Sequence, residues 1–113
     1  MPNETMPPSN RRRDIRRATR SWAKATCRKG TLDLGGDIAM RVLDLGETGV
    51  RLVVGQQIET GQEVAVTLDA PNNIKPMRIV GDVVWSLETA ERQFCVGVQF
   101  RKRIAFKDVM RLT

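Results

Sequence analysis

From about residue 21 onward the sequence alternates apolar and polar residues, and this alternation constrains the fold more than any other feature. In a β-strand successive side chains point to opposite faces of the sheet, so an alternating segment has one apolar face. Turn-forming segments rich in glycine, proline and polar residues separate the alternating ones. Six segments have the pattern: 22–28, 37–45, 49–54, 63–69, 77–87 and 94–100. Short strands joined by such turns predict an antiparallel sandwich or barrel, and closure into a barrel would hide the sheet edges.

Within these segments the alternation also predicts which side chains face the interior. Trp85 is in phase with Val83 and Leu87, so we expect its ring to be buried, and Met40 is in phase with other apolar residues of its strand. Gly97 lies on the face of its strand opposite to Val96 and Val98, where a missing side chain indicates close approach by another group. The segment 104–112 has helical spacing instead, with Arg111 near the C-terminal end, where a cation is favoured.

A chain of 113 residues is long enough for one domain with one hydrophobic core. No apolar run approaches the roughly 20 residues that cross a bilayer, and the start has no basic segment followed by an apolar one, so we expect a cytoplasmic protein without membrane insertion.

Cys27 and Cys95 are far apart in a chain without histidine, which argues against zinc and for buried, reduced thiols. No nucleophile stands beside a base, so an enzyme is not expected.

Positive charge is concentrated near the N-terminus. The stretch NRRRDIRRATR, residues 10–20, has six arginines and almost no apolar residue, so we expect it to be mobile without a partner. Residues 1–30 have nine Lys/Arg and two Asp/Glu, whereas residues 31–113 have ten and eleven. Guanidinium groups bind phosphate through two parallel hydrogen bonds and can reach the O6 and N7 edge of guanine. The stretch is therefore either an anion-binding arm or a solvated basic tail.

The arginine-rich RRRDIRR, the DLGETG that begins at Asp44, the VVWS around Trp85 and the late VGVQF together resemble the PilZ domain family. The resemblance runs from about Arg11 to Phe106. It implies a six-stranded antiparallel β-barrel with a short C-terminal helix, and a bacterial receptor domain for the second messenger cyclic di-GMP. In domain terms, residues 1–10 would be a disordered N-terminus and 11–113 a PilZ-like β-barrel domain that includes the arginine-rich arm, 11–20.

The family has two binding motifs. One is an arginine pair with a third arginine four positions on. The other is Asp or Asn, any residue, Ser, two residues, Gly. The resemblance therefore implies the following ligand-binding residues: Arg12, Arg13 and Arg17, with Arg11 and Arg16 as the alternative register, then Asp44, Gly46 and Gly49. Gly46 stands where the family has serine, so this loop lacks that hydroxyl, and Gly49 suits a positive backbone φ.

In the implied complex the arm folds over cyclic di-GMP, and Asp44 accepts hydrogen bonds from guanine N1 and N2. Ordering of the arm would then change how the domain contacts a downstream protein. No cofactor or metal is expected besides this ligand. Two alternatives stay open: a PilZ-like protein-interaction domain that has lost nucleotide binding, and a small β-barrel that binds nucleic acid, which the few aromatic residues support poorly.

Overall fold

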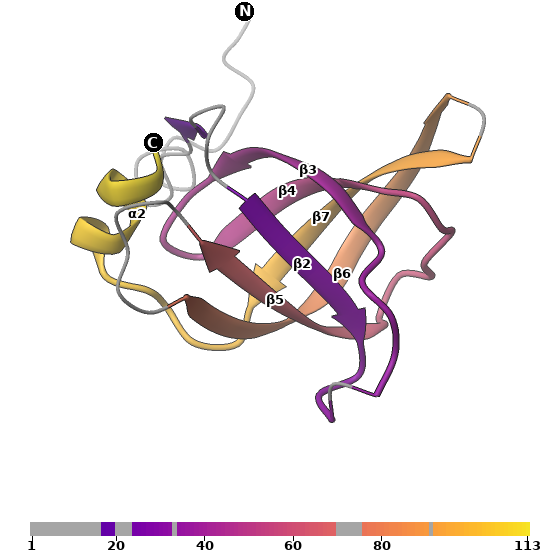
Figure 1. The fold of residues 1–113 in the computed structure, drawn as a ribbon, viewed down its shortest axis with the longest axis horizontal. Helices are drawn as coiled ribbons and strands as arrows, with labels where there is room; N and C mark the ends of the chain where they lie inside the picture. The colour runs from indigo at the N-terminus through magenta and orange to yellow at the C-terminus, as the bar shows by residue number, and fades with distance from the viewer. Residues whose placement is uncertain (1–16, 20–23, 33, 70–75, 91) are drawn as a thin grey trace, which may run out of the picture.

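The structure is a computed structural model that describes residues 17–19, 24–32, 34–69, 76–90 and 92–113. The described part of the chain is mainly β and ends in a short C-terminal helix (Figure 1). The strands are β1 (Arg17–Ala18), β2 (Lys24–Lys29), β3 (Ala39–Leu45), β4 (Gly49–Val54), β5 (Glu63–Asp69), β6 (Met77–Ala90) and β7 (Gln93–Phe100). The helix is α2 (Phe106–Leu112). The six alternating segments all contribute strands, but the described residues form seven strands, because the arginine-rich stretch adds β1.

All strands belong to one antiparallel sheet in the order β1-β3-β4-β7-β6-β5-β2. The sheet curls into a half-barrel, which brings its last strand, β2, beside β3 (Figure 1). There the Ile38 amide donates to the Cys27 carbonyl at 2.9 Å. One Asp37 carboxylate oxygen accepts from the amides of Cys27 and Ala39, each at 2.9 Å. These bonds connect β2 to the strand that follows it in sequence, so the predicted all-β, barrel-type architecture is confirmed.

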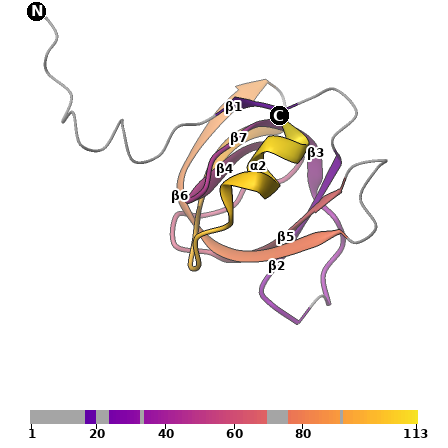
Figure 2. The ribbon, with the colours of Figure 1, turned by 90° about the vertical axis from the view of Figure 1, so that its left-hand side faces the viewer.

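The apolar faces of the strands line the inside of the curled sheet. The inward-facing Val50, Leu52, Val96 and Val98 are at most 1 % exposed. Helix α2 lies across one end of the half-barrel and buries Val109 and Leu112 against this core (Figure 2). The predicted helix is thus confirmed, with Arg111 in its last turn, although it begins after Ile104.

Two β-bulges make the predicted orientation wrong for three apolar side chains. The pairing of β3 with β4 shifts by one residue at Met40, and the pairing of β6 with β7 shifts at Val84. A bulge inserts one extra residue, so every later side chain changes face. Met40 is the extra residue of the first bulge, and Trp85 and Leu87 follow the second, so these side chains are 51, 37 and 63 % exposed instead of buried.

The bulge at Val84 places Trp85 opposite Gly97 on the outer face of the sheet. A Cβ atom at Gly97 would collide with the Trp85 indole ring, so the group predicted to approach Gly97 is this ring. Beyond Trp85 the β6–β7 hairpin projects past the half-barrel (Figure 1). Strand β6 continues beyond the alternating segment 77–87 as far as Ala90.

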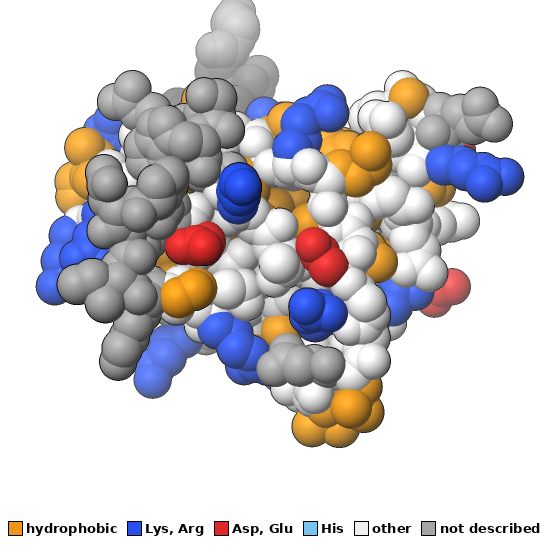
Figure 3. Space-filling view, viewed as in Figure 1, with side chains coloured by type: hydrophobic (Ala, Val, Ile, Leu, Met, Phe, Trp, Pro, Cys, Tyr) orange, Lys and Arg blue, Asp and Glu red, His pale blue; other side chains and the backbone are white. Residues whose placement is uncertain are grey.

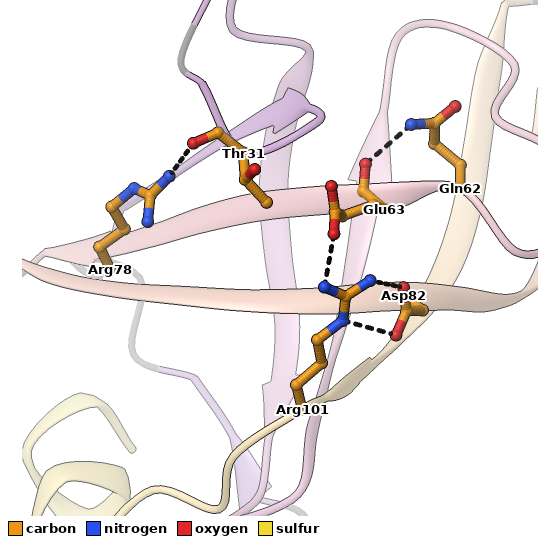
Figure 4. A network of polar contacts seen from close by, with 6 residues as sticks. All are labelled: Thr31, Gln62, Glu63, Arg78, Asp82 and Arg101. Atoms are coloured by element: carbon orange, nitrogen blue, oxygen red, sulfur yellow. Dashed lines mark hydrogen bonds and ion pairs between the residues drawn. The ribbon is translucent and has the colours of Figure 1, made fainter.

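A polar cluster fastens β5 and β6 to the end of β7 on the outer surface (Figure 4). Arg101 donates two hydrogen bonds to the Asp82 carboxylate, at 2.7 and 3.1 Å, and forms an ion pair with Glu63. The hydrogen bonds from Arg101 lower the pKa of the Asp82 carboxyl. The Asp82 and Glu63 carboxylates in turn raise the pKa of the Arg101 guanidinium. Because solvent screens such exposed pairs, they fix geometry more than they add stability.

Both cysteines are buried, as predicted. Burial, with a smaller contribution from Asp37, raises the pKa of the Cys27 thiol to about 12, so it stays protonated and unreactive at neutral pH.

Among the described residues there is no helix long and apolar enough to cross a membrane. That same part of the chain has no group of three or more Cys, Asp or Glu side chains that could hold a metal ion.

Candidate functional site

The structure brings one predicted arginine next to the predicted acidic loop. Arg17 and Ala18 form β1, which pairs with the end of β3 so that Ala18 is opposite Asp44. The following residue continues the contact, because the Thr19 hydroxyl donates to the Val42 carbonyl at 3.1 Å. Arg11, Arg12, Arg13 and Arg16 lie outside the described residues. The end of the arm is therefore attached to the strand that carries Asp44.

The Arg17 side chain contacts the C-terminal helix. Its guanidinium carbon lies 5.8 Å from the centroid of the Phe106 ring, which is the geometry of a cation–π contact. Both residues are exposed. Arg17 thus connects three parts of the fold: the arm, β3 through its backbone, and α2 through its side chain.

A third bulge, at Leu43, determines where Asp44 points. The register of β3 with β4 shifts between Val42 and Asp44, so that Asp44 pairs with Arg51 and Leu45 pairs with Val50. Without the extra residue the strand alternation would direct Asp44 inward and Leu45 outward. With it, Leu45 is fully buried in the core, and Asp44 lies on the outer face beside β1.

Asp44 forms an ion pair with Arg51 on the neighbouring strand. Arg51 Nη2 lies 2.6 Å from Asp44 Oδ2, and the Asp44 side chain is only 14 % exposed. The other carboxylate oxygen, Oδ1, and Arg51 Nε are buried and have no hydrogen-bond partner in the described part of the chain. Since buried polar atoms are nearly always paired, this pair is incomplete as it stands.

The loop after Asp44 is held by hydrogen bonds to the chain segment before α2. The Gly46 amide donates to the Gly49 carbonyl at 2.9 Å, so that N–H is already used. The carbonyls of Glu47 and Thr48 accept from the amides of Ile104 and Phe100, at 2.9 and 2.8 Å. Neither glycine has a positive φ, so the prediction for Gly49 was wrong: the residue begins β4 in extended conformation.

Cross-strand pairing aligns four residues in one row on the outer face, each on a different strand. Asp44 of β3 faces Arg51 of β4, which faces Gly97 of β7, which faces Trp85 of β6. Sequence reasoning did not predict Arg51 or Trp85 as members of this site. The signal for Arg51 was its place between the inward residues Val50 and Leu52, but the bulge that brings Asp44 opposite it has no comparable signal.

The described basic side chains do not form one continuous stripe on the face drawn in Figure 3. Lys and Arg side chains lie there in several separate groups, with acidic side chains between them. Nucleic-acid backbones are usually bound by a connected basic surface. The described side chains on this face do not form a connected basic surface of that kind.

A protein-family model described as PilZ domain matches residues 10–112 of the chain. The match includes the arginine-rich stretch, all seven strands and α2 up to its last residue. No curated protein and no solved structure matched the chain.

Proposed function

The chain belongs to the PilZ domain family, a family of cyclic di-GMP receptors, and on this premise we propose that it binds cyclic di-GMP between its arginine-rich arm and the outer face at Asp44. One observation supports the proposal above the others. Strand β1 pairs with β3 at Asp44, which puts the arm and the acidic residue of the second motif side by side. A ligand lying on this face would be next to the end of the arm at Arg17 and Ala18.

Each predicted group has a distinct task in this proposal. Arg17, with Arg12 and Arg13, donates charge-assisted hydrogen bonds to the phosphates and to guanine O6 and N7. Asp44 accepts from guanine N1 and N2. Four or five such bonds, at about 1.5 to 3 kcal/mol each, exceed the roughly 8 kcal/mol of a micromolar complex, but ordering the arm opposes them. The balance is close enough that single contacts decide the affinity.

The loop itself contributes less than the family motif implies. Gly46 has no hydroxyl, and its amide already donates to the Gly49 carbonyl. Recognition at this loop therefore depends on Asp44. The same observation favours a second candidate function, in which the domain has given up the nucleotide and only docks to a partner protein.

Isothermal titration calorimetry with cyclic di-GMP tests the proposal. We expect a binding heat at roughly tens of micromolar ligand or below, and a clear loss of affinity in Arg13→Ala and Arg17→Ala. Lys29→Ala removes one exposed positive charge at the far end of β2 and is the matched control. A larger effect of Arg17→Ala than of Arg16→Ala would assign the arginine register. A wild-type protein that gives no heat would exclude the proposal and leave the partner-docking alternative.

We expect Phe106→Leu to bind cyclic di-GMP more tightly than wild type. In the ligand-free protein the Arg17 guanidinium is engaged by the Phe106 ring, and it must leave the ring to reach a phosphate. An exposed cation–π contact is worth about 0.5 to 1 kcal/mol, so its removal should raise the affinity about 2- to 5-fold. Met110→Leu, one turn further along the exposed side of α2, is the control. Weaker binding by Phe106→Leu would mean that the ring prepares Arg17 for the ligand instead of competing for it.

This competition also suggests how binding is transmitted. When Arg17 turns to the ligand, α2 loses a contact with the arm, and the surface that combines both elements changes. A downstream protein that reads this surface would respond to the ligand.

A further inference from the structure

Arg51 belongs to neither binding motif, yet it is the only ion-pair partner of Asp44 among the described residues. It extends from β4 on the outer face, between Asp44 on β3 and Gly97 on β7. Its side chain is 43 % exposed, whereas that of Asp44 is 14 % exposed. The carboxylate is thus held from the side by a cation that itself still reaches the surface.

The geometry of the pair is not that of a salt bridge optimised for stability. Arginine and carboxylate usually pair through two parallel hydrogen bonds. Here the close contact joins Arg51 Nη2 to Asp44 Oδ2, at 2.6 Å. Asp44 Oδ1 and Arg51 Nε remain buried without hydrogen-bond partners in the described part of the chain. One carboxylate oxygen is therefore fixed by Arg51, and the other is a buried acceptor without a partner in the described part of the chain.

We propose that Arg51 is a positioning residue whose ion pair through Oδ2 holds the Asp44 carboxylate in the orientation that recognises guanine. This inference rests on the proposed function and adds the origin of base specificity to it. Guanine presents two adjacent donors, N1–H and the N2 amino group, to a carboxylate. Adenine has an acceptor at N1, so a carboxylate held in this orientation repels it. The loop has no serine at Gly46 that could orient the ligand instead, so the orientation of Asp44 depends on Arg51.

The test compares cyclic di-GMP with cyclic di-AMP by calorimetric titration of wild type, Arg51→Met and Arg51→Lys. We expect Arg51→Met to lose about 10- to 30-fold in affinity for cyclic di-GMP. This loss corresponds to the lower part of the free-energy range for one hydrogen bond to a charged group. Affinity for cyclic di-AMP should change little, so the preference for guanine falls by a similar factor. Arg51→Lys keeps a cation and should recover part of the preference. Arg41→Met, an exposed arginine on β3, is the control and should stay within about twofold of wild type.

The outcomes separate this inference from the proposed function. If wild type binds cyclic di-GMP and Arg51→Met keeps the wild-type preference for guanine, Arg51 does not position Asp44. An equal loss of both ligands would likewise overturn the inference, because it would indicate a general charge or folding effect. If wild type binds neither ligand, the proposed function fails first, and the inference fails with it. Thermal denaturation monitors folding, and Arg51→Lys decides the question if Arg51→Met does not fold.

Discussion

Asp44→Ala should reduce the affinity for cyclic di-GMP at least about 100-fold, which corresponds to about 2.7 kcal/mol. In the proposed complex the Asp44 carboxylate accepts two hydrogen bonds from guanine, each worth about 1.5 to 3 kcal/mol. Alanine removes both acceptors and leaves the guanine donors without partners inside the complex. It also releases Arg51, whose Nη2 then loses its contact at 2.6 Å. Calorimetric titration measures the loss directly.

Two further variants make this result specific. Asp44→Asn has nearly the same shape and keeps one acceptor oxygen, and the family motif accepts Asp or Asn, so it should bind with intermediate affinity. Glu88→Ala removes an acidic side chain from the exposed hairpin end of β6 and should bind like wild type. Wild-type affinity in Asp44→Ala with an intact fold by circular dichroism would contradict the assignment of Asp44 to the ligand.

The strand pattern could be predicted from sequence because burial of one sheet face imposes a period of two. Val50, Leu52 and Val54 alternate without interruption, and their predicted burial is confirmed. The pattern failed where a bulge added a residue, at Met40 and before Trp85. A bulge depends on how two strands twist against each other, and neither sequence alone contains that information.

The candidate site was predictable to a different extent. The family motifs identified Asp44 and Arg17, and the structure puts their strands side by side. Strand β1 was missed because Arg17 and Ala18 have no alternation of their own and pair only through backbone groups. Arg51 was missed because its partner Asp44 is brought opposite it by the bulge at Leu43. Residues that act through register were therefore beyond the reach of motif and periodicity.

Gly81→Ala should cause the largest loss of stability among the single-methyl changes that the sheet allows. Gly81 lies on β6 between Val64 of β5 and Phe100 of β7. A Cβ atom there would lie 2.5 Å from the Gln99 carbonyl oxygen and 2.7 Å from Val98 Cγ1. The carbonyl belongs to the backbone of a paired strand, so relief requires moving that strand. Overpacking of this kind costs about 1 to 3 kcal/mol or more, out of the roughly 5 to 15 kcal/mol that stabilise a small domain.

Thermal denaturation should therefore show a fall in Tm of roughly 10 °C for Gly81→Ala, since about 1 kcal/mol shifts Tm by roughly 4 °C or more in a domain of this size. Gly97→Ala should cost less, because its new methyl meets the Trp85 ring, a side chain that can turn away, and tryptophan fluorescence should report that movement. Gly36→Ala meets nothing within 4 Å and should change Tm hardly at all. If Gly81→Ala were as stable as Gly36→Ala, β6 and β7 would be packed less closely at Gly81 than in the structure. The strands that carry the row from Trp85 to Asp44 would then be less rigidly placed.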